Sequence, residues 1–181
     1  MATKEKMLTA VVRDRTAANR AYDWLQTHGY AAGEVNVLMS DRTRATYTAT
    51  GSKIKSGDKS VEGVATGGAI GTAVGATIGA LLALGTSVLV PGLGLVVAGP
   101  ILAGLAGGGA GAVTGGVVGG LVGLGIPESN AQAYEEALNT GGVVFGVVPH
   151  DSKDGEAIEE YFENHGGENI VYAENCCEAV A

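Results

Sequence analysis

Histidines are the first side chains in this sequence that could do chemistry, and each stands where a structural role is favoured. His28 and His165 each precede a glycine at the end of an expected helix, where an imidazolium suits the negative end of the helix dipole. His150 stands beside Asp151, without a nucleophile or a set of metal ligands nearby in the sequence. The histidines therefore predict no catalytic site and no metal site.

Cysteines and clustered glutamates are the other candidates. Cys176 and Cys177 are adjacent and are the only cysteines, so we expect untethered thiols and a reducing compartment, with a metal or redox site as the alternative. Four glutamates recur at helical spacing and predict a solvated helix face, with a weak surface for divalent cations or basic partners as the alternative. They are Glu156, Glu159, Glu160 and Glu163. No glycine is followed by lysine and then serine or threonine, which excludes a Walker A loop. We expect no enzyme, no cofactor and no identifiable small-molecule substrate.

Charge is distributed unevenly along the 181 residues. The net charge is −8, yet no charged side chain occurs from Gly63 to Pro127. Residues 128–181 carry one basic and twelve acidic side chains. Because phosphate binding needs a basic face, this acidic part excludes a nucleic-acid partner.

Two stretches at the ends of the chain share the order strand, helix, His-Gly, strand. The first has strands at 6–13 and 35–39 around a helix over 17–28, with Thr16 as its cap and Gly29 as its left-handed end. The second has strands at 143–148 and 169–173 around a helix that begins at Asp151 or Ser152. Two βαβ halves predict an α+β fold, a ferredoxin-like sandwich. An extra helix over 128–138 opens with Pro127 in its first turn.

Glycines with a period of four mark the centre of the chain. They are Gly63, Gly67, Gly71, Gly75 and Gly79, then Gly107, Gly111, Gly115, Gly119 and Gly123. This spacing predicts a glycine-zipper α-helical hairpin, with helices over 61–84 and 100–124 that pack closely and oligomerise. Its tip contains Pro91, Gly92, Leu93 and Gly94. Each interior glycine costs a helix about 1 kcal/mol relative to alanine, so lipid, the other helix or neighbouring subunits must hold these helices.

Helix length favours a lipid bilayer as that environment. About 24 residues at about 1.5 Å each exceed a hydrocarbon core of about 30 Å. Lys53, Lys55 and Lys59 precede the first helix, which places both α/β halves on the cytoplasmic side. Against a spanning hairpin, the uncharged run has no aromatic residue and its tip is apolar. A protein-only oligomer core is the alternative, whereas the period of four argues against a cross-β assembly.

These patterns divide the chain into four parts. Residues 1–42 are the first βαβ half, 43–60 a flexible basic linker, 61–126 the zipper hairpin, and 127–181 the extra helix with the second βαβ half.

The sequence also resembles a known family. The similarity is carried by residues 10–21 (AVVRDRTAANRA), 90–94 (VPGLG), 98–100 (AGP), 124–138 (LGIPESNAQAYEEAL) and 141–142 (GG). These resemble the bacterial heat-induced or general stress protein family, the YflT-like domain. The resemblance implies a bacterial, stress-related, non-enzymatic protein and assigns no functional residues.

The expected function is that of a structural protein that self-assembles through its zipper hairpin, at the cytoplasmic face of the bacterial inner membrane. Its partners are then other copies of the chain and the lipid bilayer. Two alternatives remain open: a soluble cytoplasmic scaffold with the hairpins in a protein-only core, and a module that binds a small ligand or ion.

Overall fold

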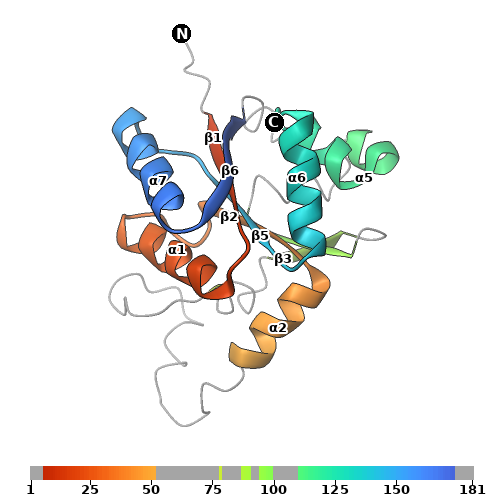
Figure 1. Cartoon of the computed structure of the whole chain (residues 1–181), viewed down its shortest axis with the longest axis horizontal. Coiled ribbons are helices and arrows are strands. Elements are labelled where there is room, and N and C mark those ends of the chain that lie inside the picture. The colour runs from red at the N-terminus through yellow and green to blue at the C-terminus, as the bar shows by residue number, and fades with distance from the viewer. Residues whose placement is uncertain (1–5, 52–77, 79–86, 91–93, 100–109, 174–181) are drawn as a thin grey trace.

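The structure is a computed structural model that describes residues 6–51, 78, 87–90, 94–99 and 110–173 (Figure 1). Within these residues the chain has an α+β fold with one antiparallel sheet, in the order β3-β4-β2-β5-β1-β6. The strands are β1 (Met7–Val12), β2 (Val35–Ser40), β3 (Ser87–Val90), β4 (Leu95–Ala98), β5 (Val143–Val147) and β6 (Gly167–Ala173). The helices are α1 (Arg15–Thr27), α2 (Asp41–Gly51), α5 (Ala110–Gly123), α6 (Glu128–Asn139) and α7 (Ser152–Asn164). The α+β class predicted from the sequence is confirmed.

Both expected βαβ halves are present, as β1-α1-β2 and β5-α7-β6. The halves interlock, because β5 lies between β1 and β2 and pairs with both. Val147 is opposite Leu8 on one side and opposite Val35 on the other. Strands from the two ends of the sequence therefore alternate across the sheet.

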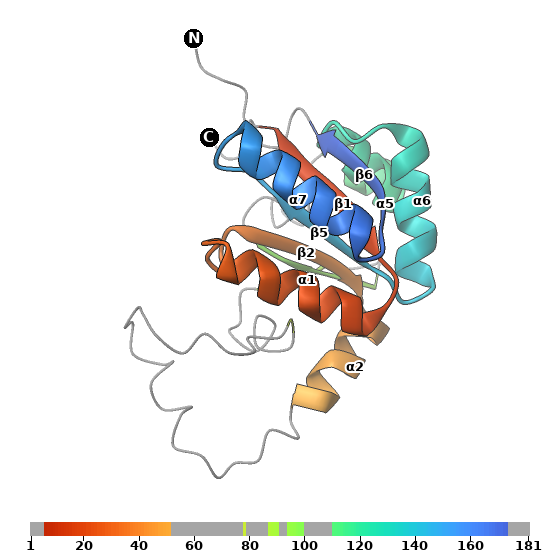
Figure 2. The ribbon, with the colours of Figure 1, turned by 60° about the vertical axis from the view of Figure 1, so that its left-hand side comes forward.

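Helices cover both faces of this sheet. Helices α1 and α7 lie side by side on one face, and α5 and α6 lie on the other (Figures 1 and 2). Successive residues of β1 point to opposite faces: Leu8 packs in the core under α1 and α7, whereas Met7 packs in the core under α6. Every residue of β1 is buried, as expected for a strand covered on both faces. The extra helix predicted over 128–138 is confirmed as α6, and it covers the second face.

Helix termini follow the capping chemistry of the sequence, with one correction. Thr16 is not the cap of the first helix; Asp14 is, and its carboxylate accepts a hydrogen bond from the Ala17 amide. An aspartate accepts more strongly at this position because its charge also suits the helix dipole. Asp151 caps α7 in the same way and confirms the prediction. Gly29 has the expected left-handed conformation, with φ of 97°.

The prediction of a flexible linker over 43–60 is wrong for the first part of that range. Residues 41–51 form α2, and the remainder of that linker lies outside the described residues. The helix has little apolar periodicity, since Thr43 and Tyr47 are its buried members among the described side chains. Tertiary contacts of these two side chains, rather than an amphipathic pattern, hold the helix on the domain.

The tip of the expected helical hairpin is also different in the structure. Its flanks form β3 and β4, and β4 pairs with β2, so this segment extends the sheet of the α/β domain. Pro91, Gly92 and Leu93 lie outside the described residues, and Gly94 has φ of 62° next to β4. Val96 and Val97 point to opposite faces and are buried in opposite cores. Their burial explains why the segment joins the sheet.

The zipper glycines are described only in α5. Gly63, Gly67, Gly71, Gly75, Gly79 and Gly107 lie outside the described residues. Gly111, Gly115, Gly119 and Gly123 belong to α5, which is interrupted at Gly116, where φ is 65° and ψ is −148°. A Cβ built on Gly123 would meet no atom of the described residues within 4 Å. In the described ranges, no helix has both the length and the apolar character needed to cross a bilayer.

Candidate anion-binding cleft

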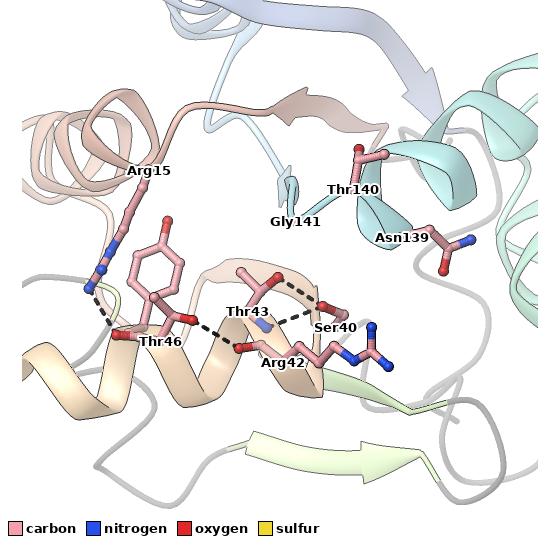
Figure 3. Close-up of a pocket in the computed structure, with 9 residues that line it drawn as sticks. Arg15, Ser40, Arg42, Thr43, Thr46, Asn139, Thr140 and Gly141 are labelled. Carbon is pink, nitrogen blue, oxygen red and sulfur yellow. Dashed lines mark hydrogen bonds between the residues drawn. The ribbon is translucent and has the colours of Figure 1, made fainter.

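A cleft of about 370 Å³ lies where the carboxyl ends of β1 and β2 meet the loop between α6 and β5 (Figure 3). We call it the arginine cleft. Its lining side chains come from three segments that are far apart in the sequence. They are Arg15, then Ser40, Arg42, Thr43, Thr46 and Tyr47, then Asn139, Thr140 and Gly141.

One side of the cleft is the first part of α2, whose start is fixed by Ser40. The Ser40 Oγ accepts a hydrogen bond from the Thr43 amide at 3.2 Å and lies 2.8 Å from the Thr43 Oγ1. The Asp41 amide donates to the Gly94 carbonyl at 2.8 Å, which joins the helix to the β3–β4 hairpin.

Arg15 is held in place by α2. Its Nη2 donates to the carbonyl of Thr46 at 3.1 Å, and its guanidinium lies 4.6 Å from the centre of the Tyr47 ring. Tyr47 is buried, and burial raises the pKa of its hydroxyl to about 12, although Arg15 acts in the opposite direction. Within the described part of the chain this hydroxyl has no hydrogen-bond partner. Tyr47 is thus a neutral group with an unused hydrogen-bonding capacity next to the cleft.

Two of the four arginines at this edge of the sheet are paired with carboxylates. Just outside the lining, Arg13 pairs with Glu168 at 2.9 Å, and Arg44 pairs with Asp41 at 3.7 Å. Among the described residues, neither Arg15 nor Arg42 has a carboxylate oxygen within 4.0 Å. Two guanidinium groups in a chain of net charge −8 are therefore left to attract an anion.

The opposite side of the cleft is the turn from α6 into β5. Gly141 has φ of 98°, which a side chain would rarely tolerate, and this lets the chain reverse towards Val143. A Cβ built on Gly141 would lie 3.9 Å from the Thr43 Oγ1, so the two sides approach closely at this point. The Thr140 Oγ1 accepts a hydrogen bond from Arg13 at 3.2 Å.

Comparisons with family models, curated proteins and solved structures found no match to this chain. The functional interpretation therefore rests on the chemistry of the side chains. The cleft offers guanidinium, hydroxyl and amide groups, which together recognise phosphate or carboxylate oxygens. Among the described residues, the nine that line the cleft include no aspartate, glutamate, histidine, lysine or cysteine, so the groups described there are binding groups.

Histidines singled out in the sequence lie away from the cleft. His28 and His165 end α1 and α7, as expected, and each Nδ1 donates to the carbonyl four residues earlier, at 2.9 and 2.8 Å. The His28 ring stacks on Trp24 and the His165 ring stacks on Tyr161. Trp24 and Tyr161 stack on each other, with ring centres 4.2 Å apart. The stack joins α1 to α7, which gives both histidines a structural role.

His150 belongs to a separate cluster. Its ring stacks on Tyr30 at 4.4 Å, and its two nitrogens lie 3.6 and 3.9 Å from carboxylate oxygens of Asp154 and Glu34. The Tyr30 hydroxyl donates to Asp154, and burial, then this hydrogen bond, raises the pKa of Tyr30. These contacts connect the segment before β2 to the first turn of α7.

Other residues weighed from the sequence are not brought into a site. Glu156, Glu160 and Glu163 are exposed on α7, in line with a solvated face, and Glu159 accepts a hydrogen bond from Tyr172 at 3.1 Å. In the ranges that the structure describes, no three potential ligands gather to hold a metal ion. Cys176 and Cys177 lie outside those ranges.

The arginine cleft itself was not anticipated. A signal was available, since Arg13, Arg15, Arg42 and Arg44 lie at or just after the carboxyl ends of two expected strands and are four of the five arginines in the chain. Carboxyl ends of parallel strands meet at one edge of a sheet and often hold a ligand there.

Proposed function

We propose that the chain is a non-enzymatic module that binds a small anionic ligand in the arginine cleft. The observation that carries this proposal is the pair of guanidinium groups, of Arg15 and Arg42, without a carboxylate partner among the described residues. Charge-assisted hydrogen bonds from arginine to phosphate or carboxylate are about twice as strong as neutral ones. The hydroxyls of Ser40 and Thr43 add donors of the kind that oxyanions use.

The fold supports a binding role for this edge. We propose that β6-β1-β5-β2, with α1 and α7, form a ferredoxin-like sandwich, because this strand order and the antiparallel pairing agree with that topology. The β3–β4 hairpin then extends the sheet at β2, and α5 with α6 covers the face that such a sandwich leaves open. The cleft lies where these additions meet the sandwich.

Removal of either arginine tests the proposal. In the full chain, Arg15→Ala and Arg42→Ala are each expected to weaken the binding of inorganic pyrophosphate about 10-fold or more, as the loss of a charge-assisted hydrogen bond predicts. Titration calorimetry measures the affinity at low and high salt, and the wild-type affinity should fall as salt screens the charges. Arg20→Ala, on an exposed part of α1, is the matched control and should bind like the wild type. No binding to the wild type at low salt would refute the proposal.

Self-assembly is the second function that we propose, for a structural, stress-related protein at the cytoplasmic face of the inner membrane or in a soluble scaffold. Two exposed apolar side chains support it: Leu89 on the outer strand β3 is 51% exposed, and Val122 on α5 is 41% exposed. Both lie in the uncharged run between Gly63 and Pro127. Exposed apolar groups beside small residues favour association with lipid or with other copies.

Particle size in the presence and absence of detergent tests this second function. A uniform particle without detergent supports the scaffold, and recovery only from membranes supports a lipid-bound protein. Gly115→Leu should reduce the particle to a smaller species, because the bulky side chain separates helices that small residues bring together. Gly33→Leu is the control, since a Cβ there meets nothing within 4 Å. An unchanged particle in Gly115→Leu would contradict assembly through the glycines.

A further inference from the structure

We infer that Arg15 is the specificity-determining residue of the arginine cleft and binds one anionic group through two parallel hydrogen bonds, whereas lysine can supply what Arg42 contributes. This inference rests on the anion-binding function proposed above and specifies how that site recognises its ligand. The anionic group then presents two oxygens on one atom, as a carboxylate or a phosphate does. Tyr47 is a positioning residue, because it acts through Arg15.

Two contacts with α2 hold the guanidinium of Arg15. Its Nη2 donates to the Thr46 carbonyl at 3.1 Å, the bond drawn beside Arg15 in Figure 3. Its Cζ lies 4.6 Å from the centre of the Tyr47 ring, within the range of a cation–π interaction. Tyr47 is buried in the core, so the ring on which the guanidinium lies is itself held in place. A guanidinium that is already held loses less freedom when it binds a ligand.

The hydrogen bond to Thr46 leaves Arg15 with one complete pair of donors. A guanidinium carries five N–H groups in one plane, and two of its edges present two N–H groups side by side. One edge combines Nε with Nη2, and the other combines Nη1 with Nη2. The Thr46 carbonyl uses one Nη2 hydrogen, so one edge keeps both donors. Among the described residues Arg15 has no other hydrogen-bond acceptor, so this edge is left for a bidentate carboxylate or phosphate.

Arg42 lines the same cleft but is not held in this way. It is exposed near the start of α2, and within the described part of the chain its guanidinium has no hydrogen bond, ion pair or ring contact. A side chain that keeps its freedom attracts an anion chiefly through its charge, which lysine also carries. At a stacked or bidentate site, however, lysine does not replace arginine, because its ammonium is a point charge on a flexible stem. The two arginines should therefore respond differently to lysine.

Lysine substitutions test this difference in the full chain, with pyrophosphate as the probe and titration calorimetry at constant ionic strength. We expect Arg15→Lys to lose at least about 10-fold in affinity, because lysine forms no bidentate pair. Arg42→Lys should stay within about 3-fold of the wild type, although Arg42→Ala binds about 10-fold more weakly. Both lysine variants keep the net charge of −8, so charge alone does not explain a difference between them.

Tyr47 variants test the positioning role. Tyr47→Phe keeps the ring beneath Arg15 and should bind like the wild type, whereas Tyr47→Leu should bind about 3- to 10-fold more weakly. In an Arg15→Ala background, Tyr47→Leu should weaken binding no further, an outcome that general damage to the cleft would not give. Equal weakening by Tyr47→Phe and Tyr47→Leu would contradict a role for the ring.

Failure of the inference and failure of the proposed function give different results. If Arg15→Lys binds like the wild type, or if Arg42→Lys binds as weakly as Arg42→Ala, the inference is wrong and anion binding stands. If the wild type does not bind pyrophosphate at low salt, the proposed function is wrong as well. The fluorescence of Trp24, the only tryptophan, reports whether each variant is folded. If the buried substitution Tyr47→Leu does not fold, the lysine pair still decides between these results.

Discussion

Replacing Gly99 with alanine is expected to lower the free energy of unfolding by about 2–6 kcal/mol, a large part of the stability of an ordinary domain. Gly99 follows β4 and has φ of 107°, a conformation that costs alanine about 1–3 kcal/mol. A Cβ there would also lie 2.5 Å from the Asn36 Oδ1 and 2.8 Å from the Asn36 Cα. Asn36 is buried and its amide donates to the Gly146 carbonyl at 3.1 Å, so it cannot move aside. Denaturant unfolding measures the loss.

Gly94→Ala is the matched control at the other end of β4. Gly94 also has a positive φ, of 62°, but a Cβ there meets no atom of the described residues within 4 Å. We expect a loss of only about 1 kcal/mol, from the backbone conformation alone. Hydrogen exchange should show β4 released from β2 in Gly99→Ala and retained in Gly94→Ala, with β1 and β5 protected in both.

This pair of variants also tests whether the segment 87–98 pairs with β2 or forms the tip of a membrane hairpin. As the tip of a membrane hairpin, the segment would be remote from β2, and Gly99 would not contact Asn36. Both alanine variants would then leave the unfolding of the α/β domain unchanged, contrary to the pairing of Val37 with Ala98 seen here. A large effect confined to Gly99 supports the sheet arrangement.

The βαβ halves were predictable because their local signals agree with the tertiary fold. Helix α1 places Ala18, Ala21, Tyr22 and Leu25 on one buried face, as their spacing indicates. Turn glycines such as Gly29 and Gly166, with φ of 97° and 87°, end the helices where expected. The observed cap, Asp14, lies two residues before the predicted Thr16, because both are capping residues and the sequence does not show which of them begins the helix.

The segment at the tip of the expected hairpin was less predictable because its apolar residues favour no single period. Between Ser87 and Ala98, valines and leucines surround Pro91 and Gly92, a pattern compatible with a β-hairpin as well as with an apolar helix end. Pairing with β2 decides in favour of strands. Helix α2 was missed for a related reason: Tyr47 packs in a core built by distant segments, and the helix has no apolar stripe of its own.

The arginine cleft could be recognised only from the tertiary structure. Arg15, Arg42 and Thr140 come from three separate segments, and the sequence does not state that a loop before β5 faces the start of α2. Their convergence follows from the insertion of β5 between β1 and β2. The absence of carboxylate partners for Arg15 and Arg42 in the described region likewise depends on side-chain geometry.

At alkaline pH, ionisation of the buried tyrosines is expected to unfold the domain. The pKa of all six is raised, chiefly by burial: Tyr22, Tyr30, Tyr47, Tyr134, Tyr161 and Tyr172. For the fully buried Tyr22 and Tyr134 and the almost fully buried Tyr47, the pKa rises from 10.0 to about 12. The folded state then holds protons that the unfolded state releases, so stability is complete below about pH 10 and falls as pH rises towards about 12. Ionisation of each of these three tyrosines should lower the free energy of unfolding by about 2 kcal/mol over this range. The sum of the three losses approaches the stability of a domain.

Tyr134→Phe separates ionisation from packing in this prediction. The Tyr134 hydroxyl donates to the Asn169 carbonyl at 2.6 Å and lies 3.0 Å from the Thr9 Oγ1, so its removal should cost about 1–2 kcal/mol at neutral pH. Above about pH 10, however, the variant should lose stability with a shallower slope, since one buried group no longer titrates. Denaturant unfolding along a pH series, with tyrosinate absorbance recorded in parallel, measures both effects. In the wild type the buried tyrosines should ionise together with unfolding. Ionisation of all six near their ordinary pKa, with the fold intact, would show that Tyr22, Tyr47 and Tyr134 are not buried in the cores described here.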